Sequence, residues 1–159
     1  LGLDPLCVYR KSNNKFVELL IQNIREKNAT YTPKGDIGAK KSYLWLRKGK
    51  SLALLMDQKL NEGLSIDFLG KPAYTASFIA DIAIRMNLDI VPIKFSRDIN
   101  NHNVITFYKK INMPKNNLSK NKKISFILKQ VNDVMSQWIK DQPENWLWIH
   151  RRWQKDLYV

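Results

Sequence analysis

The sequence contains one cysteine, Cys7, which excludes an internal disulfide and gives no evidence for an oxidising compartment. Its simplest interpretation is a small buried hydrophobic side chain in an apolar strand. No apolar run approaches the roughly 18 residues that a membrane-spanning helix needs, and no signal-peptide pattern opens the chain. Internal repeats are also absent. We therefore expect a chain that is soluble or lies on a surface.

Acidic residues are scarce. The sequence has 14 Asp and Glu against 27 Lys and Arg, a formal net charge of +13 at pH 7. The excess is spread evenly, since residues 1–80 have a net charge of +6 and residues 81–159 of +7, so there is no separate basic tail. Such an excess implies an anionic partner, which is nucleic acid, acidic lipid or a phosphorylated small molecule. Charge alone does not choose among them.

With 159 residues the chain fits one domain with a real core. Apolar runs and alternation predict strands, and apolar spacing of three and four predicts helices, including one that carries Phe16, Leu19, Leu20 and Ile24. The predicted strands are 6–9, 51–56, 89–96 and 104–111, the predicted helices are 16–24, 39–48, 76–86 capped by Thr75, and 124–140, and the predicted loops are 30–38 and 57–72. We predict an α/β fold with a central mixed sheet flanked by helices. Its parts are an α/β part (1–112), a basic linker (113–123) and a C-terminal helical segment (124–159).

Five segments together resemble the late acyltransferases of lipid A biosynthesis, the lauroyl and myristoyl transferases of the lysophospholipid acyltransferase superfamily. They occur in the family's order, and the resemblance covers nearly the whole chain. The segments are VYRKSNN (8–14), LRKGKSLALLMDQ (46–58), DFLGKPAYTA (67–76), IVPIKFSRD (90–98) and PENWLWIHRRW (143–153). The resemblance implies an acyltransferase-like fold whose N-terminal part is missing from this chain.

The family's catalytic pair is a histidine followed five positions later by an acidic residue, with the histidine as general base on the acceptor hydroxyl. Here His102 is followed by Phe107 and His150 by Lys155, so neither histidine matches. In the family the pair lies shortly before the VYR segment, and we therefore expect it upstream of Leu1, in a truncated or split chain. Since general-base assistance contributes roughly 10²- to 10⁴-fold, these residues alone should be inactive.

The resemblance implies substrate-binding roles for Tyr9 and Arg10. Arg10 matches the arginine of the family's VYR motif, where a fixed guanidinium grips a phosphate or steadies an oxyanion. The alternative is an ordinary exposed arginine. Asp57 and Gln58 match the family's aspartate-glutamine pair and follow the apolar run 51–56 directly, at the strand end where α/β sheets expose their sites. The alternative for that pair is the polar start of a loop.

Two further residues are predicted to bind substrate. Gly70 would allow a ligand to approach the backbone closely, although a simple turn explains a glycine there equally well. Arg97 ends the strand IVPIKFS and would face the same cleft, and a solvated strand end is an equally good interpretation.

The segment PENWLWIHRRW combines three tryptophans with a cationic cluster. Indole rings sit at headgroup depth in membranes and arginines meet lipid phosphates, so the segment predicts contact with a membrane surface. The alternative is that the tryptophans pack the last helix onto the sheet, and we expect some of each. The predicted contact residues are Trp146, Trp148, Arg151, Arg152 and Trp153. His150 is interpreted as a neutral core or surface histidine.

The function implied for the complete enzyme is transfer of a fatty acyl group from acyl carrier protein to a hydroxyl of a lipid A precursor, without a metal or redox cofactor. Its partners would be acyl carrier protein, a phosphorylated glycolipid acceptor and the anionic membrane surface, at the cytoplasmic face of the bacterial inner membrane. A nucleic-acid-binding basic domain is one alternative, although no helix-turn-helix, RNA-recognition or zinc-finger pattern is present. A non-catalytic fragment that binds a partner protein is the other.

Overall fold

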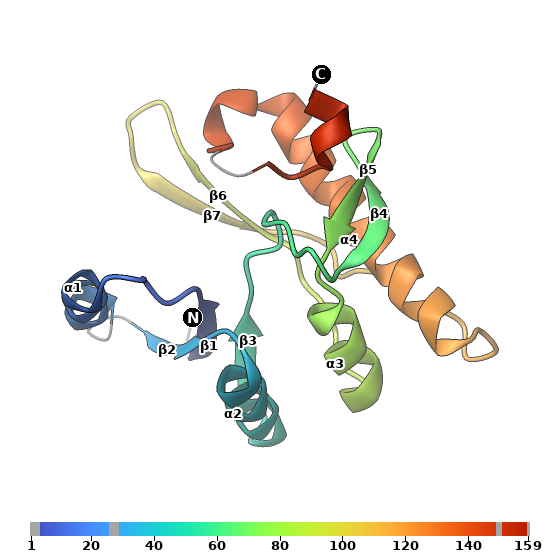
Figure 1. Cartoon of the computed structure of the whole chain (residues 1–159), viewed down its shortest axis with the longest axis horizontal. Coiled ribbons are helices and arrows are strands. Elements are labelled where there is room, and N and C mark those ends of the chain that lie inside the picture. Colours follow the sequence, from blue (N-terminus) through green and yellow to red (C-terminus); the bar gives the residue numbers. More distant parts are fainter. Residues whose placement is uncertain (1–3, 26–28, 149–150, 159) are drawn as a thin grey trace. The chain divides into compact units, whose positions relative to one another are not determined.

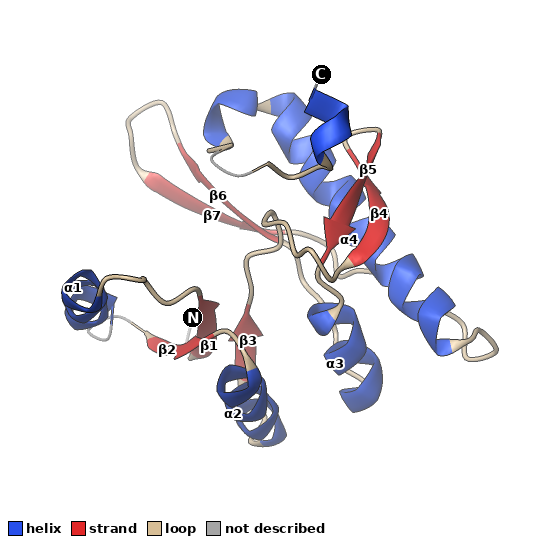
Figure 2. Cartoon of the chain, viewed as in Figure 1, coloured by secondary structure: helices blue, strands red, loops and turns tan. Residues whose placement is uncertain are grey.

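The computed structural model describes residues 4–25, 29–148 and 151–158 (Figure 1). The chain divides into two compact units, Leu1–Leu55 (unit 1) and Met56–Val159 (unit 2). Each unit has its own strands and helices (Figure 2), and each is described by itself.

Unit 1 is a small parallel sheet with two helices in its crossovers. The strand order is β2-β1-β3, with Leu6 in the central strand paired to Thr30 on one side and Leu52 on the other. Parallel strands need crossover connections, and a helix occupies each of them here. In chain order the elements are β1 (Pro5–Tyr9), α1 (Lys15–Arg25), β2 (Thr30–Pro33), α2 (Asp36–Arg47) and β3 (Ser51–Ala53).

Local sequence explains where the helices of unit 1 begin. The Asn14 side-chain oxygen accepts hydrogen bonds from the backbone N–H groups of Phe16 (2.9 Å) and Val17 (3.3 Å), which caps α1. In α2, a Cβ on Gly38 would lie 1.9 Å from the carbonyl oxygen of Pro33. Only glycine therefore lets the first turn of α2 approach the end of β2 this closely.

Unit 2 combines two antiparallel hairpins with two helices. The long helix α4 buries Ile124, Ile127, Leu128 and Val131 against α3 and the first hairpin, which contributes Ile66. This apolar stripe recurs at spacings of three and four, as expected for a helix that packs on one side. The elements are β4 (Leu64–Phe68), β5 (Lys71–Thr75), α3 (Phe78–Met86), β6 (Ile93–Arg97), β7 (Asn103–Phe107), α4 (Lys120–Asp141) and the 3₁₀ helices η1 (Pro143–Asn145) and η2 (Lys155–Tyr158).

The α/β class is confirmed, with helices near all four predicted positions. The strands of the described residues lie in three small sheets, however, where we predicted one central mixed sheet. The predicted loop 30–38 is wrong because it contains β2 and the start of α2, and the predicted loop 57–72 contains β4 and part of β5. Helix α4 begins inside the predicted basic linker, at Lys120. The predicted strand 51–56 ends early, at Ala53.

Thr75 does not cap a helix as predicted. It is the last residue of β5, and α3 starts after Ser77. Its hydroxyl is fully buried and accepts a hydrogen bond from the Asn132 side chain (3.1 Å). Tertiary contacts across the unit therefore use a hydroxyl that local sequence assigned to a helix terminus.

Candidate functional site

The end of strand β1 carries a network that fixes Tyr9. The Tyr9 hydroxyl donates to Glu18 Oε1 (2.6 Å) and accepts from the Gln22 side-chain amide (3.1 Å). Gln22 also donates to Glu18 Oε1 (2.9 Å), and the backbone N–H of Ser12 donates to Glu18 Oε2 (2.7 Å). The network joins the strand end, the following loop and α1.

Hydrogen bonds to Glu18 favour its charged form. The pKa of Glu18 is lowered, first by the Tyr9 hydroxyl and then by the Ser12 N–H, although the side chain is only 3% exposed. The pKa of Tyr9 is raised, chiefly by burial and then by the hydrogen bond to Glu18. Sequence analysis missed Glu18, and the one available indication was an acidic residue in the first turn of an amphipathic helix.

A cation holds the ring of Tyr9 from the other end of α1. The Arg25 guanidinium lies 5.2 Å from the centroid of the Tyr9 ring and 5.6 Å from that of Tyr31. The two rings meet edge to face at 6.1 Å. Tyr9 is thus held by its ring and its hydroxyl, and the next residue, Arg10, is exposed. The guanidinium of Arg10 extends from a strand end that is firmly fixed.

Asp57 and Gln58 lie in a bend at the start of unit 2, four and five residues beyond the end of β3 at Ala53. Gln58 is exposed and Asp57 is half-buried. Asp57 interacts electrostatically with Arg152: burial lowers the pKa of Arg152, and the carboxylate of Asp57 opposes that change. The predicted pair is therefore a polar bend after β3, with Gln58 in solvent and Asp57 half-buried.

Arg152 is inside unit 2, at 1% exposure. Its guanidinium donates to the carbonyl of Tyr74 and to the hydroxyl of Thr75 (2.8 Å), and lies 4.9 Å from the centre of the Phe68 ring. These contacts attach the C-terminal segment to the β4–β5 hairpin. The prediction that Arg152 contacts lipid headgroups is wrong, because the side chain is buried and its two terminal nitrogens donate to protein acceptors.

Trp153 follows the same pattern. It is 9% exposed and its indole N–H donates to the carbonyl of Phe68 (3.2 Å). The two rings pack at 5.9 Å, within the second core cluster of the unit. Trp153 is therefore a core residue, as the alternative interpretation of the segment proposed, and not a headgroup contact.

Other residues of the segment face solvent. Trp148 is 53% exposed, Leu147 is 77% exposed, and Arg151 is exposed with its guanidinium 5.8 Å from the Tyr158 ring. The half-buried Trp146 stacks on Trp148, with ring centres 5.6 Å apart and planes 7° from parallel. Of the predicted contact residues, Trp148 and Arg151 are exposed and Trp146 is half-buried behind Trp148, and the neighbouring Leu147, which was not predicted, is exposed as well. His150 lies outside the described residues.

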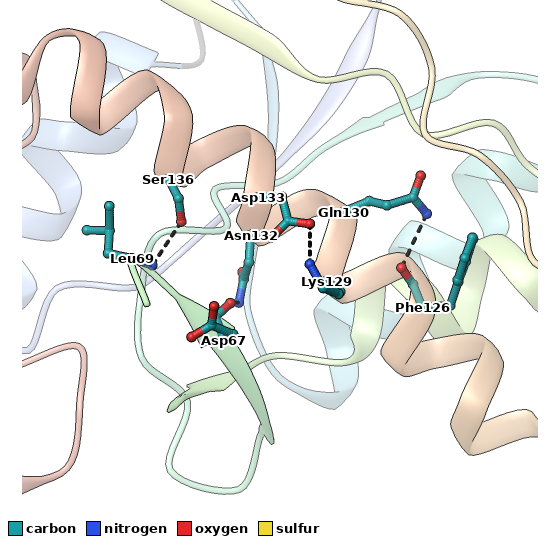
Figure 3. Close-up of polar contacts among 8 residues, drawn as sticks. All are labelled: Asp67, Leu69, Phe126, Lys129, Gln130, Asn132, Asp133 and Ser136. Atoms are coloured by element: carbon teal, nitrogen blue, oxygen red, sulfur yellow. Dashed lines mark hydrogen bonds and ion pairs between the residues drawn. The ribbon is translucent and has the colours of Figure 1, made fainter. Parts of the chain in front are cut away.

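Gly70 occupies a tight turn between β4 and β5. Leu69 and Gly70 have φ of 54° and 80°, and positive values at both central residues define a type I′ turn. The turn is tied to α4, because the Leu69 N–H donates to the Ser136 hydroxyl (3.0 Å) and the Asn132 amide donates to the carbonyl of Asp67 (3.0 Å) (Figure 3). A turn is a sufficient reason for this glycine.

A shallow polar hollow adjoins that turn. Its volume is about 210 Å³, and it is lined by Asp67, Leu69, Gly70, Asp133, Ser136, Gln137 and Lys140. On one side, Lys129 pairs with Asp133 at 2.7 Å along α4 (Figure 3). The lining is polar and the hollow is open, so it does not have the apolar walls that an acyl chain requires.

Arg97 lies at the end of β6 beside the hairpin loop. It is exposed, and its guanidinium donates to the Asn101 side chain (3.1 Å). Asp98 organises the same loop by accepting from the backbone N–H groups of Asn100 and His102, and the His102 ring lies 3.1 Å from its carboxylate. These bonds lower the pKa of Asp98, with the His102 backbone as the largest cause. Arg97 is thus part of a solvated hairpin end.

The predicted residues divide between the two units. Tyr9 and Arg10 belong to unit 1, whereas Asp57, Gln58, Gly70, Arg97 and the tryptophan segment belong to unit 2. Within unit 2, the charge of Asp57 raises the pKa of the buried Arg152 and so opposes the effect of burial. The arrangement in unit 1, an exposed arginine after a tyrosine fixed by partly buried hydrogen bonds, is the one best suited to hold an anion.

The sequence of the chain was compared with models of known protein families. The family described as bacterial lipid A biosynthesis acyltransferase matches residues 5–155 of the chain. The chain belongs to this family. The matched range includes every predicted binding residue and the whole tryptophan segment. A search of curated proteins found no match to the chain.

Membership in the lipid A acyltransferase family confirms the resemblance, and the family's activity class is acyl transfer. Across residues 4–25, 29–148 and 151–158, no three His, Cys, Asp or Glu side chains cluster as a metal site. The helices in these same ranges include none that is both long and apolar enough to cross a membrane. The prediction of a cofactor-free reaction stays a prediction.

Proposed function

We propose that this chain takes part in transferring a fatty acyl group from acyl carrier protein to a hydroxyl of a lipid A precursor, and that Arg10 binds the acceptor. The observation that carries the proposal is the exposed guanidinium of Arg10 directly after Tyr9, whose ring and hydroxyl are both fixed. An exposed guanidinium next to a fixed residue can make charged hydrogen bonds to a phosphate or to a developing oxyanion.

The chemistry defines what Arg10 can and cannot supply. The acceptor hydroxyl attacks the thioester carbonyl while a base takes its proton, and the tetrahedral oxyanion collapses to an ester as the carrier thiolate leaves and takes up a proton. Arginine stays protonated and is no base at neutral pH. Arg10 therefore acts by binding phosphate or by stabilising the oxyanion.

The base in this proposal is the family's histidine, located outside these 159 residues. The sequence of this chain has no histidine followed five positions later by an acid. The ring of His102 is directed to Asp98, which precedes it by four residues in an exposed hairpin loop, with the His102 side chain 75% exposed. That loop offers no buried position for a hydroxyl and a thioester.

The proposed partners follow from charge and exposure. Acyl carrier proteins are acidic and the acceptor is phosphorylated, so the net charge of +13 favours both encounters. The exposed Leu147, Trp148 and Arg151 support contact with an anionic membrane. We place the reaction at the cytoplasmic face of the bacterial inner membrane, where such an acceptor lies.

The test is an acyl transfer assay with acyl carrier protein as donor. Residues 1–159 should show no transfer above background, whereas a longer chain that includes a histidine and an acid five positions apart should be active. Turnover by residues 1–159 alone would contradict the assignment of the base, and would indicate His102 or His150.

Arg10→Ala in the active, longer chain tests the binding role. If Arg10 stabilises only the transition state, kcat falls by roughly 10²-fold with KM little changed, and if it holds the acceptor, KM rises. Lys40→Ala removes another exposed cation of unit 1 and serves as the matched control. An Arg10→Ala enzyme with the kinetics of the control would remove Arg10 from the site.

A further inference from the structure

Helix α1 turns its polar side inward and its apolar side outward. Glu18 is 3% exposed, and Gln22 and Arg25, one and two turns further along, are half-buried. The large apolar side chains are the exposed ones: Phe16 is 84% exposed, Val17 45%, Leu19 57%, Leu20 66% and Ile24 61%. A helix on a soluble protein normally shows the opposite pattern. We call these five residues the α1 apolar face.

The polar network explains the reversed orientation. Glu18 and Gln22 are committed to Tyr9 and Ser12, and Arg25 lies over the rings of Tyr9 and Tyr31. Turning α1 about its axis to bury its leucines would break every one of these bonds and expose Glu18. Within unit 1 these bonds therefore hold the α1 apolar face away from the strand end, and α1 lies at one end of that unit (Figure 1).

Along the described positions 10–25, the exposed charges have one sign. Arg10, Lys11 and Lys15 are exposed at its N-terminal end. Glu18 is the only acidic residue between positions 10 and 25, and it is buried. The outer surface of α1 is thus apolar and cationic with no exposed anion. A second copy of a chain with a charge of +13 would bring like charges together, so the complementary partner is apolar and anionic.

We propose that α1 is an interfacial helix that docks unit 1 onto an anionic lipid bilayer. The α1 apolar face enters the boundary between headgroups and acyl chains, and Arg10, Lys11 and Lys15 contact lipid phosphates. The 11 residues form a rod of about 16 Å, which lies in the plane of the surface. This docking holds Arg10 at headgroup depth, where its guanidinium can reach a phosphorylated acceptor. This last step rests on the proposed function.

A fluorescent label on α1 tests the docking directly. In the 159-residue protein with Cys7→Ser, Leu20→Cys carries a polarity-sensitive dye, and Ile37→Cys on α2, where Ile37 is 79% exposed, carries the same dye as the matched control. Vesicles of phosphatidylethanolamine and phosphatidylglycerol should blue-shift the dye at position 20 and leave position 37 unchanged. Phosphatidylcholine vesicles should have a much smaller effect.

Three outcomes would overturn the proposal. A dye at position 20 that is already blue-shifted without vesicles at every protein concentration would show that another part of the chain covers α1. A shift that appears as protein concentration rises would indicate a second copy. No shift with phosphatidylglycerol vesicles would show that lipid does not contact this face.

Substitution gives an independent measurement. The double variant Phe16→Gln, Leu20→Gln keeps the helix propensity of α1. It should weaken partitioning to the phosphatidylglycerol vesicles by about 100-fold, because each large apolar side chain that leaves water for the bilayer contributes about tenfold. Ile37→Gln with Ile99→Gln removes two isolated exposed isoleucines, 79% and 97% exposed, and should change partitioning by less than about threefold. Equal losses in both double variants would overturn the proposal.

Circular dichroism separates unfolding from loss of docking. Both double variants should keep the spectrum of the parent protein, because all four substituted side chains are solvent-exposed. Vesicles in these experiments contain neither acceptor nor acyl donor. A failure of docking is therefore distinguishable from a failure of acyl transfer. The vesicle experiments test the docking, and the acyl transfer assay tests the proposed function.

Discussion

Arg151 and Arg152 are adjacent in the chain and are chemically identical, yet the structure gives them separate tasks. Arg151 is exposed beside the Tyr158 ring, whereas Arg152 is buried and donates to Tyr74 and Thr75. Sequence analysis treated the two as one cationic cluster. The structure predicts that substitution at the two positions has different consequences.

Arg152→Ala should destabilise the protein by about 2–4 kcal/mol, because it leaves a cavity and removes the hydrogen bonds to the Tyr74 carbonyl and the Thr75 hydroxyl. Arg151→Ala should leave stability unchanged and weaken binding to anionic vesicles by about 1 kcal/mol at low salt. Thermal unfolding and vesicle sedimentation measure the two effects, and Arg151→Lys, which keeps the charge, is the control. An Arg152→Ala protein that melts normally but loses vesicle binding would reverse the assignment.

The Glu18 network predicts a pH dependence of stability. Because the folded pKa of Glu18 lies below its ordinary value of 4.5, its contribution is present above that value and is lost as pH falls through the folded pKa. Glu18→Gln removes the charge and places an amide donor near the Ser12 N–H, so it should destabilise unit 1 at neutral pH.

The measurement compares melting temperatures between about pH 7 and about pH 3. Asp81 and Asp98 also have lowered pKa values, so acid should destabilise the variant as well. The gap between parent and Glu18→Gln should narrow as the pH falls below about 4.5. A gap that is constant over the whole range would show that the charge of Glu18 contributes nothing to stability.

At the scale of elements, α1 and α4 show that the same periodicity leads to opposite packing. In α4 the apolar stripe around Ile127 and Leu128 is fully buried. In α1 the stripe is exposed because polar partners at the end of β1 hold the other side of the helix. Spacing identifies a helix and its apolar face, but the neighbouring elements decide which face is buried.

Gly38 and Gly70 are required for different reasons, close packing at Gly38 and a positive φ at Gly70. Gly38→Ala should destabilise unit 1 by about 1–3 kcal/mol, because its Cβ would collide with the carbonyl of Pro33. Gly70→Ala meets open space but has a φ of 80°, so strain of about 1–2 kcal/mol is expected. Gly70→Asn, which tolerates that φ better, should melt closer to the parent.

Activity of the Gly70→Asn protein in the longer, active chain tests the ligand interpretation of this residue. If Gly70 only forms the turn, acyl transfer should follow stability and remain near the parent value. A folded Gly70→Asn enzyme with strongly reduced transfer would indicate that a substrate approaches the backbone at the turn beside the polar hollow.

At the scale of the whole molecule, the dominant property is a net charge of +13 spread over both units. Cations on many surfaces favour any polyanion, so affinity for one anionic ligand does not identify the partner. The exposed apolar residues of α1 and the exposed Leu147 and Trp148 favour a lipid surface over a nucleic acid.

We therefore expect retention on phosphatidylglycerol vesicles to exceed retention on single-stranded oligonucleotides at matched salt. Binding to vesicles should weaken as salt rises, since the screening length falls from about 10 Å at 0.1 M to about 3 Å at 1 M, but a residual apolar part should persist. Tighter binding to oligonucleotides at every salt concentration would favour the nucleic-acid alternative.

Much of the α/β fold was predictable because apolar residues recur with a short period along each helix and form short runs in the strands. The region 57–72 was not, since its two strands alternate around only a few buried residues, among them Ile66 and Phe68, and its glycines suggested a loop. The family was predictable from five segments of residues in order. The roles within those segments were harder to predict, as Arg152 and Trp153 show.

Sequence by itself determined the helices, the family, the charge and the position of Arg10 after a strand. These depend on local spacing and on residue identity. Tertiary structure alone decided that Arg152 is internal, that Glu18 holds Tyr9, and that α1 presents its apolar side outward. The physical reason is that burial and hydrogen bonding join residues such as Arg152 and Tyr74, far apart in the chain, and no local pattern specifies such partners.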